Sequence, residues 1–324
     1  MTLTERAAPH LLTLVMAAAI GPLAMNVFLP SLPGMARHFE SDYAVMQLAV
    51  SFYLVATAGL QLFIGPASDR FGRRPVLLVC IGLFLVGTVA AVYAPTVEFL
   101  LACRLLQAFS SAGMVISRAV VRDTVSAVEA AGQIGYITMG MSVVPMIGPL
   151  IGGYLDEIFG WQAGFWLTFA FGVAAFLIIL FDMPETNRRR SESLVAQFRA
   201  YPTLLGSMLF WCYALTAAFA TGAFFAFIGG DPYVATEMLN LSPSQYGLYF
   251  GVISVGYMLG NFLSGRFARR IGINRMMLSG NLVACFGMIL AIVLFKAGLY
   301  HPLSLFGPMF FAGLGNGAGF FCLS

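Results

Sequence analysis

An arginine-rich segment, Gly65-Pro-Ala-Ser-Asp-Arg-Phe-Gly-Arg-Arg-Pro75, separates two long apolar runs in the first third of the chain. Each run is about 20 residues long, which is the length that a helix needs to cross the hydrocarbon core of a bilayer. Glycines let two helix ends approach closely and turn sharply, and the carboxylate of Asp69 can accept hydrogen bonds from neighbouring arginines. The pattern therefore predicts two membrane-spanning helices joined by a tight, charged loop.

The composition of the whole chain agrees with this interpretation. Of 324 residues, 60% are hydrophobic and only 10% are charged, which is unusual for a soluble globular domain. We expect an all-α, polytopic membrane protein, and the first apolar run, being too long for a signal peptide, is interpreted as a retained span. Ten spans are predicted: Leu11–Pro33, Val45–Pro66, Pro75–Tyr93, Glu98–Arg118, Gln133–Leu155, Trp161–Asp182, Thr203–Gly229, Gln245–Gly265, Arg275–Ala297 and Pro302–Leu323.

The positions of the cationic residues predict the orientation, because lysine and arginine are retained in cytoplasmic loops. If alternate loops face the same side, one side collects 14 of the 17 lysines and arginines. Arg37 and Lys296 fall on the opposite side, and Arg104 lies inside a span. We therefore expect a multi-pass membrane protein with a cytoplasmic amino terminus.

An internal repeat divides the chain into two related halves. Gly65–Gly72 returns as Gly265-Arg-Phe-Ala-Arg-Arg-Ile-Gly272, 200 residues later and again between two spans. We expect an amino-terminal six-helix bundle over residues 1–183 and a polar cytoplasmic linker over residues 184–202. Residues 203–324 are predicted to form an incomplete carboxy-terminal bundle of about four spans, two fewer than the first half.

The arginine-rich segment closely resembles the GxLaDrxGrkxxl signature of the major facilitator superfamily, found there between the second and third helices. The resemblance implies two six-helix bundles, of which about ten of the twelve spans are present. It also implies that Asp69 latches neighbouring helices in one state of a transport cycle, whereas the simpler alternative is a turn that only fixes the topology. The residues of this conformational-switch loop are Gly65, Asp69, Arg70, Gly72, Arg73 and Arg74.

The fourth span carries Arg104-Leu-Leu-Gln107, which is similar to the RxxQG signature of proton-coupled exporters, with Ala108 in place of the usual glycine. An arginine inside a span is costly and marks a function by default, usually by facing a cavity or a carboxylate. The resemblance implies a role for Arg104 and Gln107 in proton movement. The alternative is that Arg104 extends to the outer membrane interface.

The fifth span carries a proline- and glycine-rich sequence, Pro145-Met-Ile-Gly-Pro-Leu-Ile-Gly-Gly153. It looks like the GPxxGG antiporter signature, which is found in exporters and generally not in uptake members. Small residues at this spacing form a face for close helix contact, and the prolines permit a kink. The residues of this antiporter motif are Gly148, Pro149, Gly152 and Gly153.

Together with three further segments, these motifs resemble the Bcr/CflA subfamily of drug exporters over essentially the whole chain. The three segments are Pro30-Ser-Leu-Pro33 closing the first span, Ser117–Asp123 after the fourth, and Leu241–Phe250 opening the eighth. The resemblance implies a location in a bacterial inner membrane and export of varied small molecules, such as bicyclomycin, chloramphenicol-type or sulfonamide drugs, in exchange for protons. An exporter or facilitator of a small metabolite, such as an amino acid or a sugar, is the alternative.

One position departs from this pattern, because Asn26 stands where relatives commonly carry a titratable acid. If that acid binds protons or cationic drugs in relatives, this protein uses another group, recognises neutral substrates or couples differently. The carboxylates that remain are the proton-coupling candidates Asp123 and Asp231, and Asp69 of the switch loop. We expect Asp231 at the end of the seventh span, near the outer mouth, where a solvated loop carboxylate is the default.

By analogy with transporters of this kind, the substrate cavity lies between the halves near the bilayer midplane. Aromatic and methionine side chains suit varied hydrophobic ligands because they are adaptable and polarizable. The candidates for this cavity are Asn26, Phe28, Met141, Phe219, Phe224 and Phe225. In an apolar helix each of them is also an ordinary packing or lipid-facing residue.

Other classes of function find little support in the sequence. The glycines of Gly313–Gly319 follow no predicted strand and lack a GxxxxGK[ST] pattern, so close helix packing is expected rather than nucleotide binding. The five cysteines and three histidines show no metal-ligand spacing. We expect no enzyme activity, cofactor, metal or nucleic-acid partner, and a monomer whose partners are the bilayer, a small-molecule substrate and protons.

Overall fold

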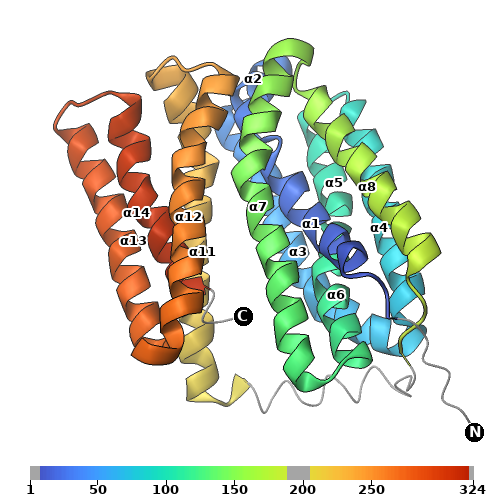
Figure 1. Ribbon diagram of the computed structural model, residues 1–324. Helices are drawn as coiled ribbons and strands as arrows, with labels where there is room; N and C mark the ends of the chain where they lie inside the picture. Colours follow the sequence, from blue (N-terminus) through green and yellow to red (C-terminus); the bar gives the residue numbers. More distant parts are fainter. Residues whose placement is uncertain (1–7, 188–204, 321–324) are drawn as a thin grey trace, which may run out of the picture. The chain divides into compact units, whose positions relative to one another are not determined.

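The computed structural model describes residues 8–187 and 205–320, and within these ranges the regular structure is helical (Figure 1). The elements are α1 (Leu11–Asn26), η1 (Leu29–Ser31), α2 (Leu32–His38), α3 (Tyr43–Phe71), α4 (Arg73–Val92), α5 (Val97–Gln107), η2 (Ala108–Ser110), α6 (Ser111–Thr124), α7 (Ala127–Phe159), α8 (Gln162–Asp182), α11 (Met208–Tyr233), η3 (Val234–Met238), α12 (Pro243–Ile271), α13 (Ile273–Lys296) and α14 (Pro302–Phe320). The prediction of an all-α fold is confirmed.

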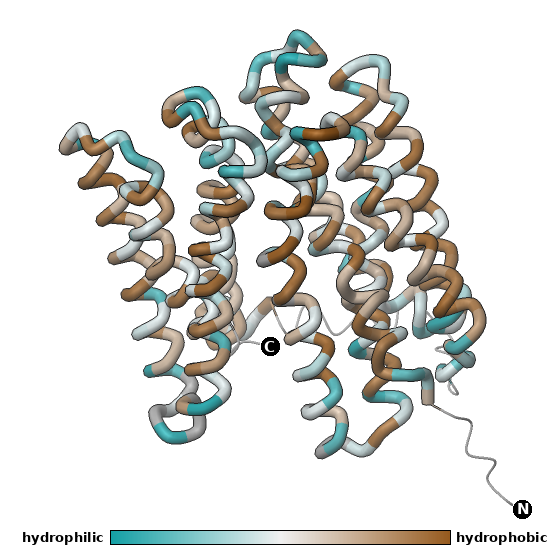
Figure 2. The backbone as a smooth tube through the Cα atoms, turned by 45° about the horizontal axis from the view of Figure 1, so that its top comes forward, coloured by the Kyte–Doolittle hydropathy of each residue, from teal (hydrophilic) through white to brown (hydrophobic). Residues whose placement is uncertain are grey.

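Nine segments of the described residues are long and apolar enough to cross a membrane. Hydrophobic residues predominate along the lengths of the helices, while hydrophilic residues gather at the turns between them (Figure 2). The tenth predicted span forms helix α14 but is not among the nine. Its two prolines, several glycines and Asn316 lower its hydropathy.

The chain divides into two compact units. The first comprises Met1–Phe28, Gly34–Val144 and Trp161–Ala200, and the second comprises Leu29–Pro33, Pro145–Gly160 and Tyr201–Ser324. The second half of α7 therefore belongs to the second unit. The predicted linker over residues 184–202 falls mostly outside the described residues. The division of the chain into two bundles at this linker therefore stays a prediction.

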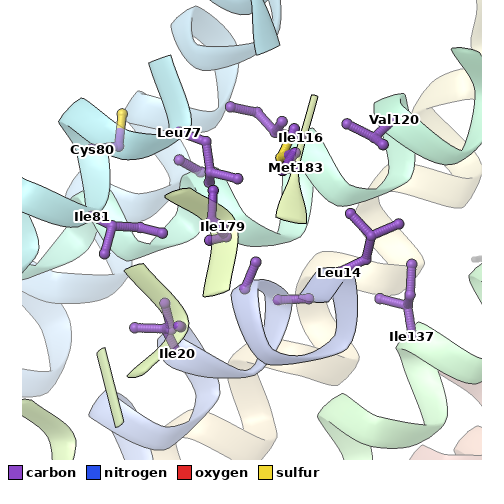
Figure 3. Packing of buried hydrophobic residues seen from close by; sticks show 14 of the residues in the cluster. Leu14, Ile20, Leu77, Cys80, Ile81, Ile116, Val120, Ile137, Ile179 and Met183 are labelled. Atoms are coloured by element: carbon purple, nitrogen blue, oxygen red, sulfur yellow. The ribbon is translucent and has the colours of Figure 1, made fainter. Parts of the chain in front are cut away.

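The core of the first unit is formed by apolar, mostly aliphatic side chains from six helices, α1, α3, α4, α6, α7 and α8. Figure 3 shows Leu14 and Ile20 of α1 packed among residues of α4, α6 and α8. The tightest approach is between α1 and α6, because a Cβ placed on Gly113 would overlap the backbone carbonyl of Ala17. Small residues allow such backbone contact in a membrane protein, where hydrophobicity alone does not hold helices together.

In the second unit, α14 lies between α12 and α13 and packs by glycine contacts. A Cβ on Gly313 or Gly317 of α14 would overlap a backbone carbonyl of α12, and a Cβ on Gly256 or Gly260 of α12 would overlap one of α14. Gly315 contacts α13 in the same way. The prediction of close helix packing for the glycine run is confirmed.

The first span was predicted to end at Pro30–Pro33, and this is wrong. The helix breaks after Asn26, passes through the 3-10 turn η1 and resumes as α2, which ends at His38. Pro30 has no amide hydrogen to donate and disfavours a helical conformation of the residue before it, so the prolines interrupt the helix without ending it. The break leaves carbonyl groups at the end of α1 without regular helical donors.

The charged loop predicted over residues 65–75 is a single residue. Helix α3 continues to Phe71 and α4 begins at Arg73, so only Gly72 lies outside a helix, with φ of +107°. Gly272 makes the equivalent turn between α12 and α13, with φ of +89°. Both torsions lie in the region that favours glycine, so the internal repeat extends to backbone geometry.

Candidate functional site

The Gly72 turn organises a cluster of charged side chains around Arg73. Because Gly72 is the only residue between the two helices, Asp69 lies in the last turn of α3 and Arg73 in the first turn of α4. Arg73 pairs with Asp69 and, through Nε, with Oδ2 of Asp123 at 3.0 Å. Its Nη1 also donates to Oγ of Ser68 at 2.7 Å. Two carboxylates from different helices thus share one guanidinium, which is 11% exposed.

Glu185, which follows α8, completes this cluster and was missed from the sequence. Its carboxylate accepts hydrogen bonds from the backbone amides of Arg73 at 2.9 Å and Arg74 at 3.3 Å. These amides belong to the first turn of α4, where helical donors lack partners and a negative charge is favoured. The side chain of Asn187 donates to the carbonyl of Asp69 at 2.6 Å. The segment after α8 therefore joins the α3–α4 turn, and its only sequence signal is polarity directly after the sixth span.

Arg104 of α5 is fully buried, so the alternative that it extends to the membrane interface is wrong. Its Nε donates to the carbonyl of Ala49 on α3, and its Nη1 donates to the carbonyl of Ala24 on α1, both at 3.2 Å. Nη1 also lies 2.5 Å from Oε1 of Gln107. Arg104 therefore joins three helices through neutral oxygens.

The contact with Ala24 ties Arg104 to the break in the first span. Ala24 is among the last four residues of α1, whose carbonyls have no regular helical donor. A cation at a helix carboxy terminus also interacts favourably with the helix dipole. Arg104 therefore acts as a cap for the interrupted end of α1, while its Nη2 has no hydrogen-bond partner among the described residues.

Two aromatic rings enclose the guanidinium. The Arg104 Cζ atom lies 4.2 Å from the ring centre of Phe28 and 4.5 Å from that of Tyr53. The Tyr53 hydroxyl donates to the carbonyl of Gly21 at 3.1 Å and lies 2.8 Å from Oγ of Ser110. Tyr53 was missed from the sequence, because a tyrosine in an apolar run carries no signal of its own.

Gln107 extends the network to a fourth helix. It is fully buried, and its Nε2 donates to Oγ1 of Thr88 on α4 at 3.1 Å. The Thr88 hydroxyl in turn donates to the carbonyl of Phe84 at 2.8 Å. The structure therefore brings Arg104 and Gln107 together, as their spacing of three residues on one helix predicts.

The antiporter motif lies on a buried face of α7. Gly148, Pro149, Gly152 and Gly153 are all buried, although α7 has exposed residues on either side of them. Within the second unit this face meets α12, because a Cβ on Gly153 would overlap the carbonyl of Pro243. A Cβ on Gly247 would overlap the carbonyl of Pro149. The two helices touch backbone to backbone, with one small residue supplied by each.

Asp231 was expected in a solvated loop, and this is wrong. Helix α11 continues through Gly229, Gly230 and Pro232, and Asp231 is 3% exposed inside it. The Tyr246 hydroxyl of α12 donates to its Oδ2 at 3.0 Å. Oδ1 has no hydrogen-bond partner among the described residues. The seventh span thus carries a buried carboxylate with a single hydrogen-bond donor.

The cavity candidates divide between the two units. Asn26 and Phe28 are buried in the first unit, where the Asn26 amide donates to the carbonyl of Pro22 at 2.7 Å. Phe224 and Phe225 form a T-shaped pair on α11, and Phe219 is 75% exposed. Met141 is half-buried against the core of the first unit. Their predicted role in binding substrate stays a prediction.

These features define a polytopic helical membrane protein with two related units, a buried arginine and glycine-mediated helix contacts. The sequence profile of the Major Facilitator Superfamily matches residues 14–324, and the chain belongs to this family. Its fold is similar to that of a bacterial homolog of the human lysosomal transporter Spinster, crystallised in an inward-facing and unoccupied conformation. The TM-score is 0.73 at 20% sequence identity, over 97% of this chain and 73% of that chain.

Among curated proteins, the chain is 33% identical over 258 residues to the uncharacterized MFS-type transporter YdgK of Bacillus subtilis, covering 78% of this chain and 64% of that protein. It is 30% identical over 261 residues to multidrug resistance protein D of Escherichia coli, covering 80% and 66%. It is 27% identical over 277 residues to a bicyclomycin resistance protein homolog of Haemophilus influenzae, covering 82% and 68%. These relatives fit the predicted resemblance to Bcr/CflA-type exporters. The chain spans about two thirds of their length, and slightly less for YdgK and multidrug resistance protein D.

Proposed function

We propose that the protein exports small hydrophobic or amphipathic compounds, drugs among them, across the inner membrane in exchange for protons. A binding site opens alternately to the two sides of the membrane as the two bundles move against each other. In this proposal the protein works as a monomer whose partners are the bilayer, the substrate and protons.

The observation that carries the proposal is the backbone contact of α7 with α12. It is built from the residues that resemble the antiporter signature, and a Cβ on either Gly153 or Gly247 would overlap the facing helix. A contact made only by backbone and small residues can form or break as a unit, without repacking of long side chains. The names of two relatives, multidrug resistance protein D and a bicyclomycin resistance protein homolog, support the same substrate class.

The cluster around Arg73 supplies a second element that can switch. Asp69 and Asp123 belong to α3 and α6, and both pair with the guanidinium of Arg73 on α4. A shared, partly exposed ion pair can exchange partners at low cost, because neither carboxylate is left buried without a donor. We propose that this cluster holds the three helix ends together in one state of the cycle and releases one of them in the other.

The proposed orientation places the Gly72 turn and the amino terminus in the cytoplasm. Arg70, which is exposed beside this turn, offers a position for labelling. In a variant without other cysteines, Arg70→Cys should react with a membrane-impermeant thiol reagent only after the cells are permeabilised. Labelling in intact cells would refute the orientation.

Transport can be tested in cells that lack their own multidrug exporters and express the gene that encodes this chain. Cells with the protein should accumulate less fluorescent drug or labelled chloramphenicol than control cells, and a protonophore should abolish the difference. Equal accumulation in both, with the protein present in the membrane, would refute drug export. Export of a labelled amino acid or sugar without any drug export would favour the metabolite alternative.

A further inference from the structure

The carboxylate of Asp231 is a buried titratable group in the second unit. It is 3% exposed and lies among fully or almost fully buried apolar residues, including Ile228 and Ala235 on its own segment. Tyr246, its hydrogen-bond donor, is fully buried, and its ring contacts the rings of Phe250 and Phe306 at 5.9 and 6.0 Å. This surrounding does not solvate a negative charge.

Within the described part of the second unit, the charged and titratable groups around this carboxylate do not supply a counter-charge. Helix α11 has no other charged residue, and η1 and α14, which pack against it, have none. Four exposed groups lie close to the packed segments: Tyr233 and Glu237 follow Asp231, His301 precedes α14, and Glu157 near the end of α7 accepts a hydrogen bond from Ser242, just before α12. Tyr249, three residues after Tyr246 on α12, is half-buried and stacks on Phe306. The next cation along α12 is Arg266, 20 residues after Tyr246 and therefore about 30 Å away along the helix.

We propose that Asp231 is a proton-binding site and that Tyr246 sets the stability of its ionised form. A proton neutralises a carboxylate without any change in packing, which suits a fully enclosed group. A metal cation needs several oxygen ligands, whereas the polar neighbour of Asp231 is a hydroxyl that donates to it. Oδ1, which lacks a hydrogen-bond partner among the described residues, is the oxygen that takes the proton.

The next residue along the helix supports this assignment. Pro232 has no amide hydrogen, so the carbonyl of Ile228 loses the donor that a regular helix would provide. A protonated carboxyl can donate to a carbonyl in the preceding turn of its own helix. The α-helix also gives way to the π-helix η3 directly after Tyr233, so a change of protonation acts where the helix is already irregular.

Proton binding at Asp231 would supply the proton site of the proposed antiport. The link between proton binding and transport rests on that proposed function, whereas proton binding itself does not. Binding itself can be measured by infrared titration of the purified protein in lipid nanodiscs. The wild-type protein should show a protonated carboxyl band at neutral pH, and Asp231→Asn should abolish it. Tyr246→Phe removes the donor to the ionised form and should move the midpoint to higher pH by about one unit. Glu237→Gln, which changes an exposed carboxylate on the same segment, should leave the band unchanged.

A protonated band that persists in Asp231→Asn would overturn the proposal, as would a band that is displaced by sodium ions at constant pH. Asparagine resembles the protonated carboxyl in shape, so this variant should fold and can be compared directly. If the band is lost in Asp231→Asn while drug export keeps the same pH dependence, Asp231 binds a proton but does not couple it to export. If the band behaves as expected and no drug is exported by the wild-type protein, the proposed function fails and the proton site stands.

Discussion

Replacing Arg104 by lysine should destabilise the protein more than replacing it by methionine. Arginine donates to Ala24, Ala49 and Gln107 from two nitrogens of a rigid fork, and two rings enclose it. Lysine keeps the buried charge but offers it from a single nitrogen, which cannot reproduce this geometry. Breaking the interactions of a buried charge while leaving it in place costs about 3–5 kcal/mol.

Methionine removes the charge together with its hydrogen bonds. It leaves the Ala24 carbonyl and the Gln107 amide oxygen without this donor, at about 1–3 kcal/mol each, or roughly 2–6 kcal/mol in total. The third acceptor, the Ala49 carbonyl, lies inside α3 and keeps its helical donor, so it is not counted. Against this, the protein no longer holds a desolvated cation, which costs several kcal/mol. The net loss in Arg104→Met should therefore be about 0–3 kcal/mol, which is smaller than the loss in Arg104→Lys.

The free energy of unfolding can be measured by denaturant titration of each variant in detergent micelles. The expected order of stability is wild type, then Arg104→Met, then Arg104→Lys. Arg275→Lys is the matched control, because Arg275 is exposed at the start of α13 and the same exchange should change stability by less than about 0.5 kcal/mol. If Arg104→Lys is as stable as the wild type, or more stable than Arg104→Met, the assignment of Arg104 as a cap held by neutral oxygens is refuted.

Three further predictions concern the helix contacts and the Arg73 cluster. Gly247→Val forces a side chain against the backbone of α7 and should lower the free energy of unfolding by about 1–3 kcal/mol and reduce export, whereas Gly251→Val, with no atom within 4 Å of its new Cβ, should do neither. Asp123→Asn breaks a partly exposed pair with Arg73, so it should cost less than about 1 kcal/mol of stability but change the export rate; an unchanged rate would exclude a switching role. Glu185→Gln weakens the cap of α4 and should lower the free energy of unfolding by about 0.5–1 kcal/mol at low salt, with a smaller effect at high salt; equal losses at both would argue against a charge–dipole contribution.

The sequence predicted the helices well because the length and apolarity of a membrane span are fixed by the bilayer. It predicted the repeat because Gly72 and Gly272 occupy positions that need a positive φ. Its predicted ends of the first and seventh spans are wrong, because prolines and glycines in the sequence suggest helix ends there and the structure continues through them. Inside a membrane a helix tolerates these residues, since neighbouring groups satisfy the freed backbone, and Arg104 does this for the break after α1.

The candidate site was predictable where a single residue has a high free-energy cost inside a membrane span. A buried arginine in a span is conspicuous, so Arg104 was found, but its acceptors are backbone carbonyls of other helices and carry no signal in the sequence. Glu185 was missed for a related reason, because it caps a helix that begins more than 100 residues earlier. Such contacts depend on tertiary packing and not on local pattern.

The four predicted proton-coupling residues differ in whether they can change charge at all. Arg104 is a guanidinium, which stays protonated in proteins, and Gln107 is an amide that does not titrate. Asp123 is paired with Arg73 and belongs to the cluster at the Gly72 turn. Asp231 alone among the four is a buried carboxylate with one neutral donor, so that losing or gaining a proton changes the local free energy steeply. Arg104 therefore supplies a fixed charge that holds helices of the first unit together. If the protein exchanges substrate for protons, the proton must be carried by a group with the properties of Asp231.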